Sequence, residues 1–210
     1  YHSIENIGII GIGIGMGVIG IAVDNQVLLV LGFTGGILHV LNHSLFKSLL
    51  FFNAGSVYKA THTRNIEMLG GLIKKMPVTA VFFLIGSLAI CGLPPLNGFI
   101  SEYLIFAGLF KSVSGAGLYL AILLLFSIIG LALIGGLALF CFTKAFGIVF
   151  LGEASSQKAA NAKEVGRVML LPQILLVASI LAIGLGSAVF VKPVAGIVSS
   201  LFELPGDLAF

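Results

Sequence analysis

The chain has 210 residues, of which 59% are hydrophobic and 9% are charged, and its mean hydropathy is +1.18. A soluble domain carries roughly 25% charged residues, so this composition excludes a globular protein with a water-facing surface. It predicts an all-α polytopic membrane protein, because helices satisfy their own backbone hydrogen bonds in lipid. The net charge of +3 comes without a basic cluster interleaved with aromatic residues, so we expect no nucleic-acid partner.

Five apolar segments are long enough to cross a bilayer, for which about 20 residues suffice. In the first, the run from Gly15 to Gly20 matches a dinucleotide-binding fingerprint, but it lacks the strand and the acidic residue that should flank such a motif. The pairs Gly11/Gly15 and Gly13/Gly17 favour close helix packing instead. The segments cover approximately residues 4–23, 27–59, 77–110, 118–150 and 168–191.

The second segment carries His39, His43 and Lys47 inside an otherwise apolar run. Their spacing places them on one face of a helix. Such a row is a functional-site hypothesis by default, because an uncompensated charge at mid-bilayer costs about 2.5–3.5 kcal/mol or more. The segment is too long for one upright span, so we expect it to tilt, to extend beyond the bilayer or to break near residues 32–36.

The third segment is interrupted by Pro94 and Pro95, with Gly92 before them and Gly98 after them. Proline lacks the backbone N–H, and its ring clashes with the preceding helical turn. The sequence therefore predicts a broken helix, which is tolerated at membrane depth only where protein or a watery cavity surrounds it. Glu102 follows the break and is expected on the second half-helix.

These ionisable residues together predict a buried proton relay through His39, His43, Lys47 and Glu102. Histidine titrates closest to neutral pH without help, and Lys47 and Glu102 bring charges of opposite sign. Two further residues are secondary candidates with competing interpretations, because a lysine near a helix end usually snorkels and a carboxylate near a segment end can lie at the interface. They are Lys144 and Glu5.

Metal binding is a competing use of the spacing between His39 and His43. No third ligand is evident, since His62 lies in a loop and lysine is a poor ligand. A lone intramembrane histidine can also be an ordinary hydrogen-bonded packing residue. Cys91 and Cys141 both fall in apolar segments and are expected to pack there. We therefore expect no metal and no cofactor in this chain.

The connections differ in charge, which predicts an orientation. The loops of residues 60–76 and 152–167 carry most of the loop Lys and Arg, and they lie two crossings apart. The positive-inside rule places both of them in the cytoplasm. We expect the 152–167 stretch to be a solvated linker, followed by a terminal transmembrane helix and tail over residues 168–210.

Several strings resemble the antiporter-like subunits of complex I and of group 4 membrane-bound hydrogenases, in particular the hydrogenase-4 B-type component of formate hydrogenlyase. They are Tyr-His-Ser-Ile-Glu-Asn-Ile-Gly at residues 1–8, the file from His39 to Lys47, Thr-His-Thr-Arg-Asn-Ile-Glu at 61–67 and Gly-Leu-Pro-Pro-Leu-Asn-Gly-Phe-Ile-Ser-Glu at 92–102. The resemblance covers about residues 1 to 150. Because the chain starts at Tyr1 inside such a string, we expect it to be a piece of a longer protein.

This resemblance implies a proton channel built from two inverted repeats, each with a broken helix. Residues 1–151 would be most of the second repeat, with His39, His43 and Lys47 on its hydrophilic axis and Glu102 at the exit. The implied partners are other membrane subunits, a peripheral redox arm, protons and the lipid of a bacterial or archaeal cytoplasmic membrane. A subunit of a multisubunit Na⁺/H⁺ antiporter and a structural membrane anchor are the alternatives.

Overall fold

The computed structural model describes residues 2–204, so Tyr1 and the end of the tail, 205–210, lie outside it. Within residues 2–204 the chain is 81% helical and has no strand, which confirms the predicted fold class. Two short 3-10 helices, η1 (Ile66–Met68) and η2 (Leu72–Lys74), follow the second helix. The α-helices are α1 (His2–Ala22), α2 (Gln26–Thr61), α3 (Pro77–Ile90), α4 (Asn97–Val113), α5 (Leu118–Phe150), α6 (Gln157–Ala160), α7 (Arg167–Leu185) and α8 (Ser187–Leu201).

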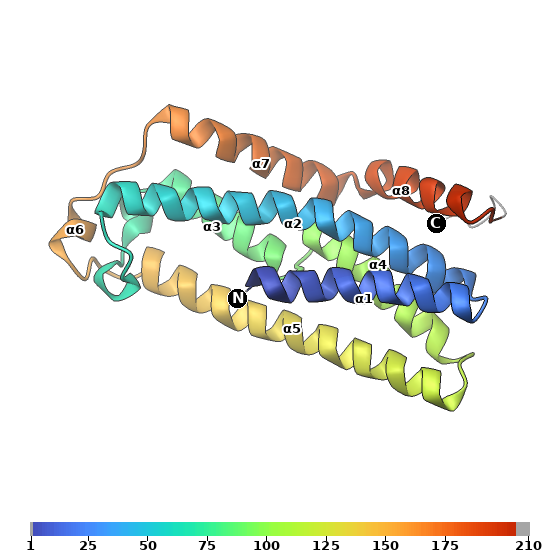
Figure 1. Cartoon of the computed structure of the whole chain (residues 1–210). Coiled ribbons are helices and arrows are strands. Elements are labelled where there is room, and N and C mark those ends of the chain that lie inside the picture. Colours follow the sequence, from blue (N-terminus) through green and yellow to red (C-terminus); the bar gives the residue numbers. More distant parts are fainter. Residues whose placement is uncertain (1, 205–210) are drawn as a thin grey trace.

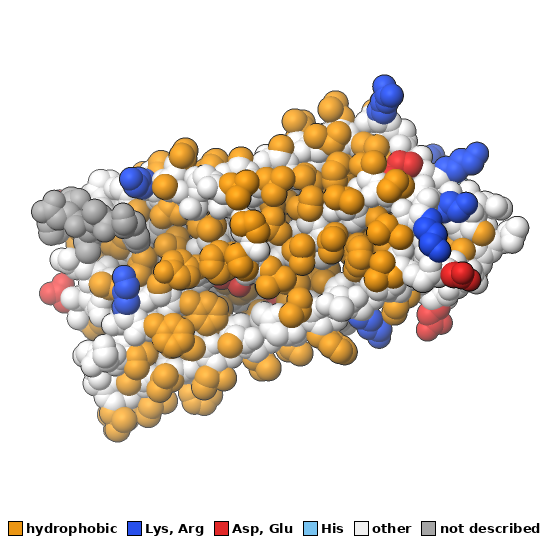
Figure 2. Space-filling view, turned by 180° about the vertical axis from the view of Figure 1, so that it is seen from behind, with side chains coloured by type: hydrophobic (Ala, Val, Ile, Leu, Met, Phe, Trp, Pro, Cys, Tyr) orange, Lys and Arg blue, Asp and Glu red, His pale blue; other side chains and the backbone are white. Residues whose placement is uncertain are grey.

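Four helices of this described part, α1, α2, α5 and α7, are long and apolar enough to cross a membrane. Helices α3 and α4 have only 14 and 17 residues, and they lie end to end as the two halves of the predicted broken segment (Figure 1). Figure 2 shows apolar side chains over the middle of the molecule and most charged side chains gathered at one end. This distribution is the one that a bilayer requires.

Helix α2 is the central element of the fold, and it is a single unbroken helix of 36 residues. It packs against α1, α3, α4, α7 and α8. Asn25 begins it by accepting a hydrogen bond from the backbone N–H of Leu28, the usual role of an N-cap residue. Residues 32–36, where a break was one expectation, remain helical.

Glycines explain how closely α1 approaches α2. A Cβ on Gly13 would lie 2.8 Å from the Cα of Gly36, and a Cβ on Gly17 would overlap the ring of Phe33. The predicted pair Gly13/Gly17 thus faces α2. The pair Gly11/Gly15 does not, because a Cβ at either position would meet no atom of residues 2–204 within 4 Å. Close packing at this second pair therefore stays a prediction.

The break between α3 and α4 spans residues 91–96, as Pro94 and Pro95 predicted. Gly92 has a φ of +62°, a conformation that side-chain-bearing residues rarely adopt. A second break, which the sequence did not predict, separates α7 from α8 at Gly186. The two breaks lie together, because a Cβ on Gly184 would collide with the carbonyl oxygen of Pro95. The terminal segment is therefore also an interrupted helix, and it continues to Leu201 rather than ending near residue 191.

The two basic loops meet at one end of the bundle. The backbone N–H of Gly71 donates to the carbonyl of Leu151, and that of Ser155 donates to the carbonyl of Leu69. Glu164 accepts hydrogen bonds from the N–H groups of Val78 and Thr79 and from the Thr79 hydroxyl. The 152–167 stretch is thus folded against the first turn of α3 rather than simply solvated.

Candidate functional site

The four residues predicted to form a relay lie on two neighbouring helices. His39, His43 and Lys47 are on α2, and Glu102 is on α4, the half-helix that follows the proline break. His39 is fully buried, and the other three are half-buried. His43 lies one helical turn after His39, and Lys47 one turn after His43. The structure therefore brings the file together along one helix, beside a helix break.

His39 connects three helices through its two ring nitrogens. Nε2 lies 3.1 Å from Oδ1 of Asn6 on α1, and Nδ1 lies 2.9 Å from Oγ of Ser101 on α4. An amide oxygen can only accept a hydrogen bond, so Nε2 carries a hydrogen. Nδ1 remains the nitrogen that can gain or lose a proton, and its partner is the Ser101 hydroxyl.

The Ser101 hydroxyl has more partners than it has hydrogens. Oγ lies 2.9 Å from Nδ1 of His39, accepts from Nδ2 of Asn42 at 2.9 Å and can donate to the carbonyl of Gly98 at 3.1 Å. When the Ser101 hydroxyl donates its hydrogen to Nδ1, that nitrogen accepts and His39 is neutral. When the hydroxyl turns to Gly98, Nδ1 must donate and His39 is an imidazolium. Rotation of one hydroxyl thus accommodates both protonation states.

Asn42 and Asn97 support the contact between His39 and Ser101 through further hydrogen bonds. Asn42 donates to the backbone carbonyl of Asn97 at 2.8 Å, and Asn97 donates to Oδ1 of Asn42 at 3.1 Å. Both side chains are fully buried. Buried polar side chains that bond across helices in this way fix the relative position of the helices. Here they fix α4 against α2 at its first turn.

Glu102 lies beside this network but is not part of it. Its carboxylate reaches back to the helix break, since a Cβ on Gly92 would contact both carboxylate oxygens. It makes no hydrogen bond or salt bridge to any of residues 2–204. Gly92 is therefore needed twice, for its positive φ and for the space that the carboxylate occupies. The break creates the place in which Glu102 sits.

Lys47 and His43 are similarly without polar partners in the described part of the chain. The ammonium of Lys47 lies 5.5 Å from the centre of the Phe51 ring, a cation–π distance. Nε2 of His43 is buried and has no hydrogen-bond partner among residues 2–204. The ring of His43 makes an edge contact with Phe46, with centroids 5.6 Å apart. These two side chains can change partner or charge without breaking a hydrogen bond to the protein.

The two secondary candidates, Glu5 and Lys144, differ in their surroundings. Glu5, in the first turn of α1, pairs with His2. His2 in turn lies against Phe142 of α5, with ring centroids 4.8 Å apart. Because the neighbouring Asn6 bonds to His39, Glu5 lies level with the middle of α2. Lys144 is exposed on α5, as a snorkelling lysine would be.

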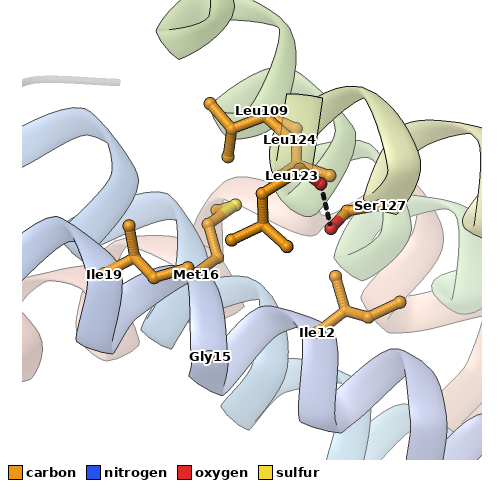
Figure 3. Close-up of a pocket in the computed structure, with 8 residues that line it drawn as sticks. All are labelled: Ile12, Gly15, Met16, Ile19, Leu109, Leu123, Leu124 and Ser127. Carbon is orange, nitrogen blue, oxygen red and sulfur yellow. Dashed lines mark hydrogen bonds between the residues drawn. The ribbon is translucent and has the colours of Figure 1, made fainter. Parts of the chain in front are cut away.

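Two other kinds of site find little support in the described residues. An apolar pocket of about 110 Å³ between α1, α4 and α5 (Figure 3) is lined by seven residues that cannot ionise and by Ser127. The Ser127 hydroxyl is already bonded to the carbonyl of Leu123, so this pocket offers no proton-carrying group. Residues 2–204 contain no group of three or more His, Cys, Asp or Glu side chains that could hold a metal ion.

Sequence reasoning missed the neutral members of the site, Asn6, Asn42 and Asn97, and mentioned Ser101 only as a neighbour of Glu102. A usable signal was present for Asn42, which follows His39 by three residues on the same helix face. Asn6 and Asn97 gave no such signal, because their contacts join residues 33 and 55 positions apart.

Comparison with known proteins identifies the family of the chain. Residues 13–130 match the family described as "NADH:quinone oxidoreductase/Mrp antiporter, TM". The chain belongs to this family. Formate hydrogenlyase subunit 3 of Escherichia coli (strain K12) is 50% identical over 163 residues, which are 77% of this chain and 27% of that protein. Hydrogenase-4 component B of the same strain is 40% identical over 188 residues, which are 90% and 28%.

The fold has the same relatives. A chain of respiratory complex I from Thermus thermophilus superposes with a TM-score of 0.69 and 26% identity, over 96% of this chain and 38% of that one. The resemblance to antiporter-like membrane subunits is therefore confirmed. The chain spans only about a quarter of the length of the curated relatives named above, 27% and 28%.

Proposed function

We propose that this chain moves protons across the membrane as part of a redox-driven complex of the hydrogenase or complex I type. The observation that carries the proposal is the pair Lys47 and Glu102. Both are half-buried in the middle of the helical bundle, and neither has a salt-bridge partner within the described chain. Ionisable residues inside a membrane protein are costly to keep and typically mark ion pathways.

The relay we propose has two parts, one within α2 and one between α2 and α4. Lys47 and His43 form the first, in which a proton is exchanged between groups whose charges act on each other. His39 and Ser101 form the second, in which the hydroxyl can turn between His39 and Gly98. Glu102, next to Ser101 at the helix break, is the last member. The residues cover about 12 Å of α2 from His39 to Lys47, at 1.5 Å per residue.

The driving force would come from a change of charge next to Lys47. An opposite charge nearby favours the charged form of a group, and burial disfavours it. Movement or protonation of such a neighbour would release or bind a proton at Lys47. Redox chemistry in a peripheral arm of the complex would supply the first change, and other membrane subunits would transmit it.

We further propose that the joined loops of residues 60–76 and 152–167 face the cytoplasm. Their hydrogen bonds to each other support a common side, and their lysines and arginines favour the inner one. Under this orientation the turn at Asn25 and the end of α8 face outward. The membrane would be the bacterial or archaeal cytoplasmic membrane.

The test uses vesicles that contain the complete complex and a pH-sensitive dye. We expect Lys47→Met to abolish redox-driven proton uptake, because the variant keeps the shape of the side chain but cannot carry a proton. Lys144→Met, which removes an exposed lysine from α5, is the matched control and should leave uptake unchanged. Full uptake in the Lys47→Met complex would refute the proposal and would favour a structural membrane anchor.

A second candidate function is cation/proton exchange, because the family description names Mrp antiporters together with the quinone oxidoreductases. It predicts Na⁺-dependent proton movement in the same vesicles without an electron donor. Proton uptake that needs the electron donor and ignores Na⁺ would exclude it.

A further inference from the structure

A stripe of fully buried side chains follows the face of α2 toward α3, α4 and α7, and its chemistry changes twice along the helix. Its positions recur every three or four residues, so they lie on one face. At one end the stripe is polar, in the middle it is apolar, and at the other end it is polar again. Its members are His39, Asn42, Phe46, Leu49, Asn53 and Ser56, each 0% exposed.

The polar end nearer the joined loops contains a cluster that the proposed relay does not use. Nε2 of Gln173, on α7, donates to Oγ of Ser56 at 3.0 Å and to the carbonyl of Met169 at 2.8 Å. Nδ2 of Asn53 donates to the carbonyl of Leu49. Oδ1 of Asn53 and Oε1 of Gln173 are buried and have no partner among residues 2–204. We call Asn53, Ser56 and Gln173 the loop-side cluster.

Two buried amide oxygens without a protein partner indicate a ligand with hydrogens to donate. A buried polar atom left unpaired costs about 1–3 kcal/mol, and in proteins such atoms are usually satisfied by water. Asn53 lies one helical turn before Ser56 on the same face, and Ser56 bonds Gln173. Water is the ligand that a cluster of neutral amides and a hydroxyl can hold.

The apolar middle of the stripe separates this cluster from the His39 network. Phe46 and Leu49 pack with Ala89, Ile90 and Leu96 of the broken helix and with Val177 and Ile180 of α7. Along α2, Asn42 and Asn53 are about 16 Å apart at 1.5 Å per residue. Over this distance the stripe presents only hydrocarbon, and hydrophobic constrictions in membrane proteins can block conduction by excluding water.

Phe46, in the apolar middle of the stripe, also contacts the histidines of the relay. Its ring makes edge contacts with His39 and with His43, at centroid distances of 6.2 Å and 5.6 Å. The apolar middle of the stripe therefore lies next to both histidines.

We propose that Phe46 and Leu49 form an apolar plug between the His39 network and a water-binding pocket made by Asn53, Ser56 and Gln173. The inference rests on the proposed proton-translocating function and adds a barrier and a hydration site to it. At rest the plug keeps the two polar regions apart, so protons do not leak along α2. Oδ1 of Asn97, in the His39 network, also lacks a partner among residues 2–204, so the barrier separates two polar regions that can each bind water.

The first test measures passive proton leak in vesicles with the complete complex, under an imposed pH difference and without electron donor. We expect Phe46→Ser combined with Leu49→Ser to raise the leak by about tenfold or more, equivalent to about 1.4 kcal/mol off the barrier. Phe150→Ser is the matched control. Phe150 is also fully buried, but it packs on Phe83 and Phe146 near the joined loops. An assembled plug variant that leaks no more than this control would overturn the proposal.

The second measurement uses the unmodified complex and so does not depend on a variant folding. A cryo-electron microscopy map that resolves water should show water on Oδ1 of Asn53 and on Oε1 of Gln173, with none beside Phe46. A continuous file of water past Phe46, or amide oxygens contacted by protein alone, would overturn the proposal. The two hypotheses fail separately. Leak through the plug variant with full uptake in Lys47→Met would refute only the relay, and the reverse result would refute only the plug.

Discussion

The ionisable residues of α2 differ from one turn of the helix to the next in how they are held. Toward α4, His39 is fully buried, and both ring nitrogens have partners at 2.9 Å and 3.1 Å. One and two turns further along, His43 and Lys47 are half-buried and have no hydrogen bond to the described chain. The same helix thus presents one fixed group and two free ones.

This difference separates the residues that can bind and release a proton from those that position them. Buried hydrogen bonds between helices fix geometry, so the His39 network positions α4 and Glu102. A group without a fixed partner can bind or release a proton without breaking such a network. Lys47 and Glu102 have no fixed partner. Ser101 belongs to the network, but its hydroxyl can change partner.

An effect as large as that of Lys47→Met is expected from Glu102→Gln, which keeps the size of the side chain but cannot release a proton. Positioned acids and bases contribute about 10²–10⁴-fold to proton transfer, so we expect redox-driven uptake to fall by about a hundredfold or more. Glu164→Gln is the control, because Glu164 caps α3 by accepting hydrogen bonds. Stopped-flow dye measurements on the complete complex provide the rate. Equal uptake in the two variants would remove Glu102 from the relay.

A smaller effect is expected from Ser101→Ala, which removes the rotating hydroxyl. Interhelical hydrogen bonds in membranes contribute up to about 1.7 kcal/mol, so we expect uptake to slow by roughly tenfold. Ser101→Thr keeps a hydroxyl and should restore most of the rate. If threonine and alanine behave alike while both complexes assemble, Ser101 has only a packing role.

The smallest effect on transport is expected from Glu164→Ala at the joined loops. Losing an N-terminal cap costs about 0.5–2 kcal/mol, so the variant should unfold at a lower temperature with its uptake rate unchanged. Glu153→Ala removes an exposed acid from the same linker and should change neither property. Loss of uptake in Glu164→Ala at full assembly would show that the loop end takes part in transport.

Local chemistry made part of this architecture predictable. Pro94 and Pro95 break a helix whatever surrounds them, and charges in an apolar run are visible without a structure. The second break was missed because Gly186 stands without a proline, and glycine is common in membrane helices. The folded linker was missed because Glu164 caps a helix that lies 85 and 86 positions away in the chain.

Except for Asn42, the neutral members of the site could not be predicted from the sequence. Asn6, Asn97 and Ser101 come from α1 and α4, and only the packing of those helices on α2 brings them to His39 and Asn42. An isolated asparagine in an apolar segment predicts a hydrogen bond but not its partner. By contrast, the positions of His39, His43 and Lys47 relative to one another follow from helix geometry alone.

The central claim is that Glu102 changes its protonation during turnover. Redox-triggered infrared difference spectroscopy on the complete complex measures this directly, through the stretching band of a protonated carboxyl group. We predict a band that disappears in Glu102→Gln, persists in Glu164→Gln and is suppressed in Lys47→Met, which interrupts the relay. A carboxyl band that persists unchanged in Glu102→Gln, in a complex that still takes up protons, would contradict the account.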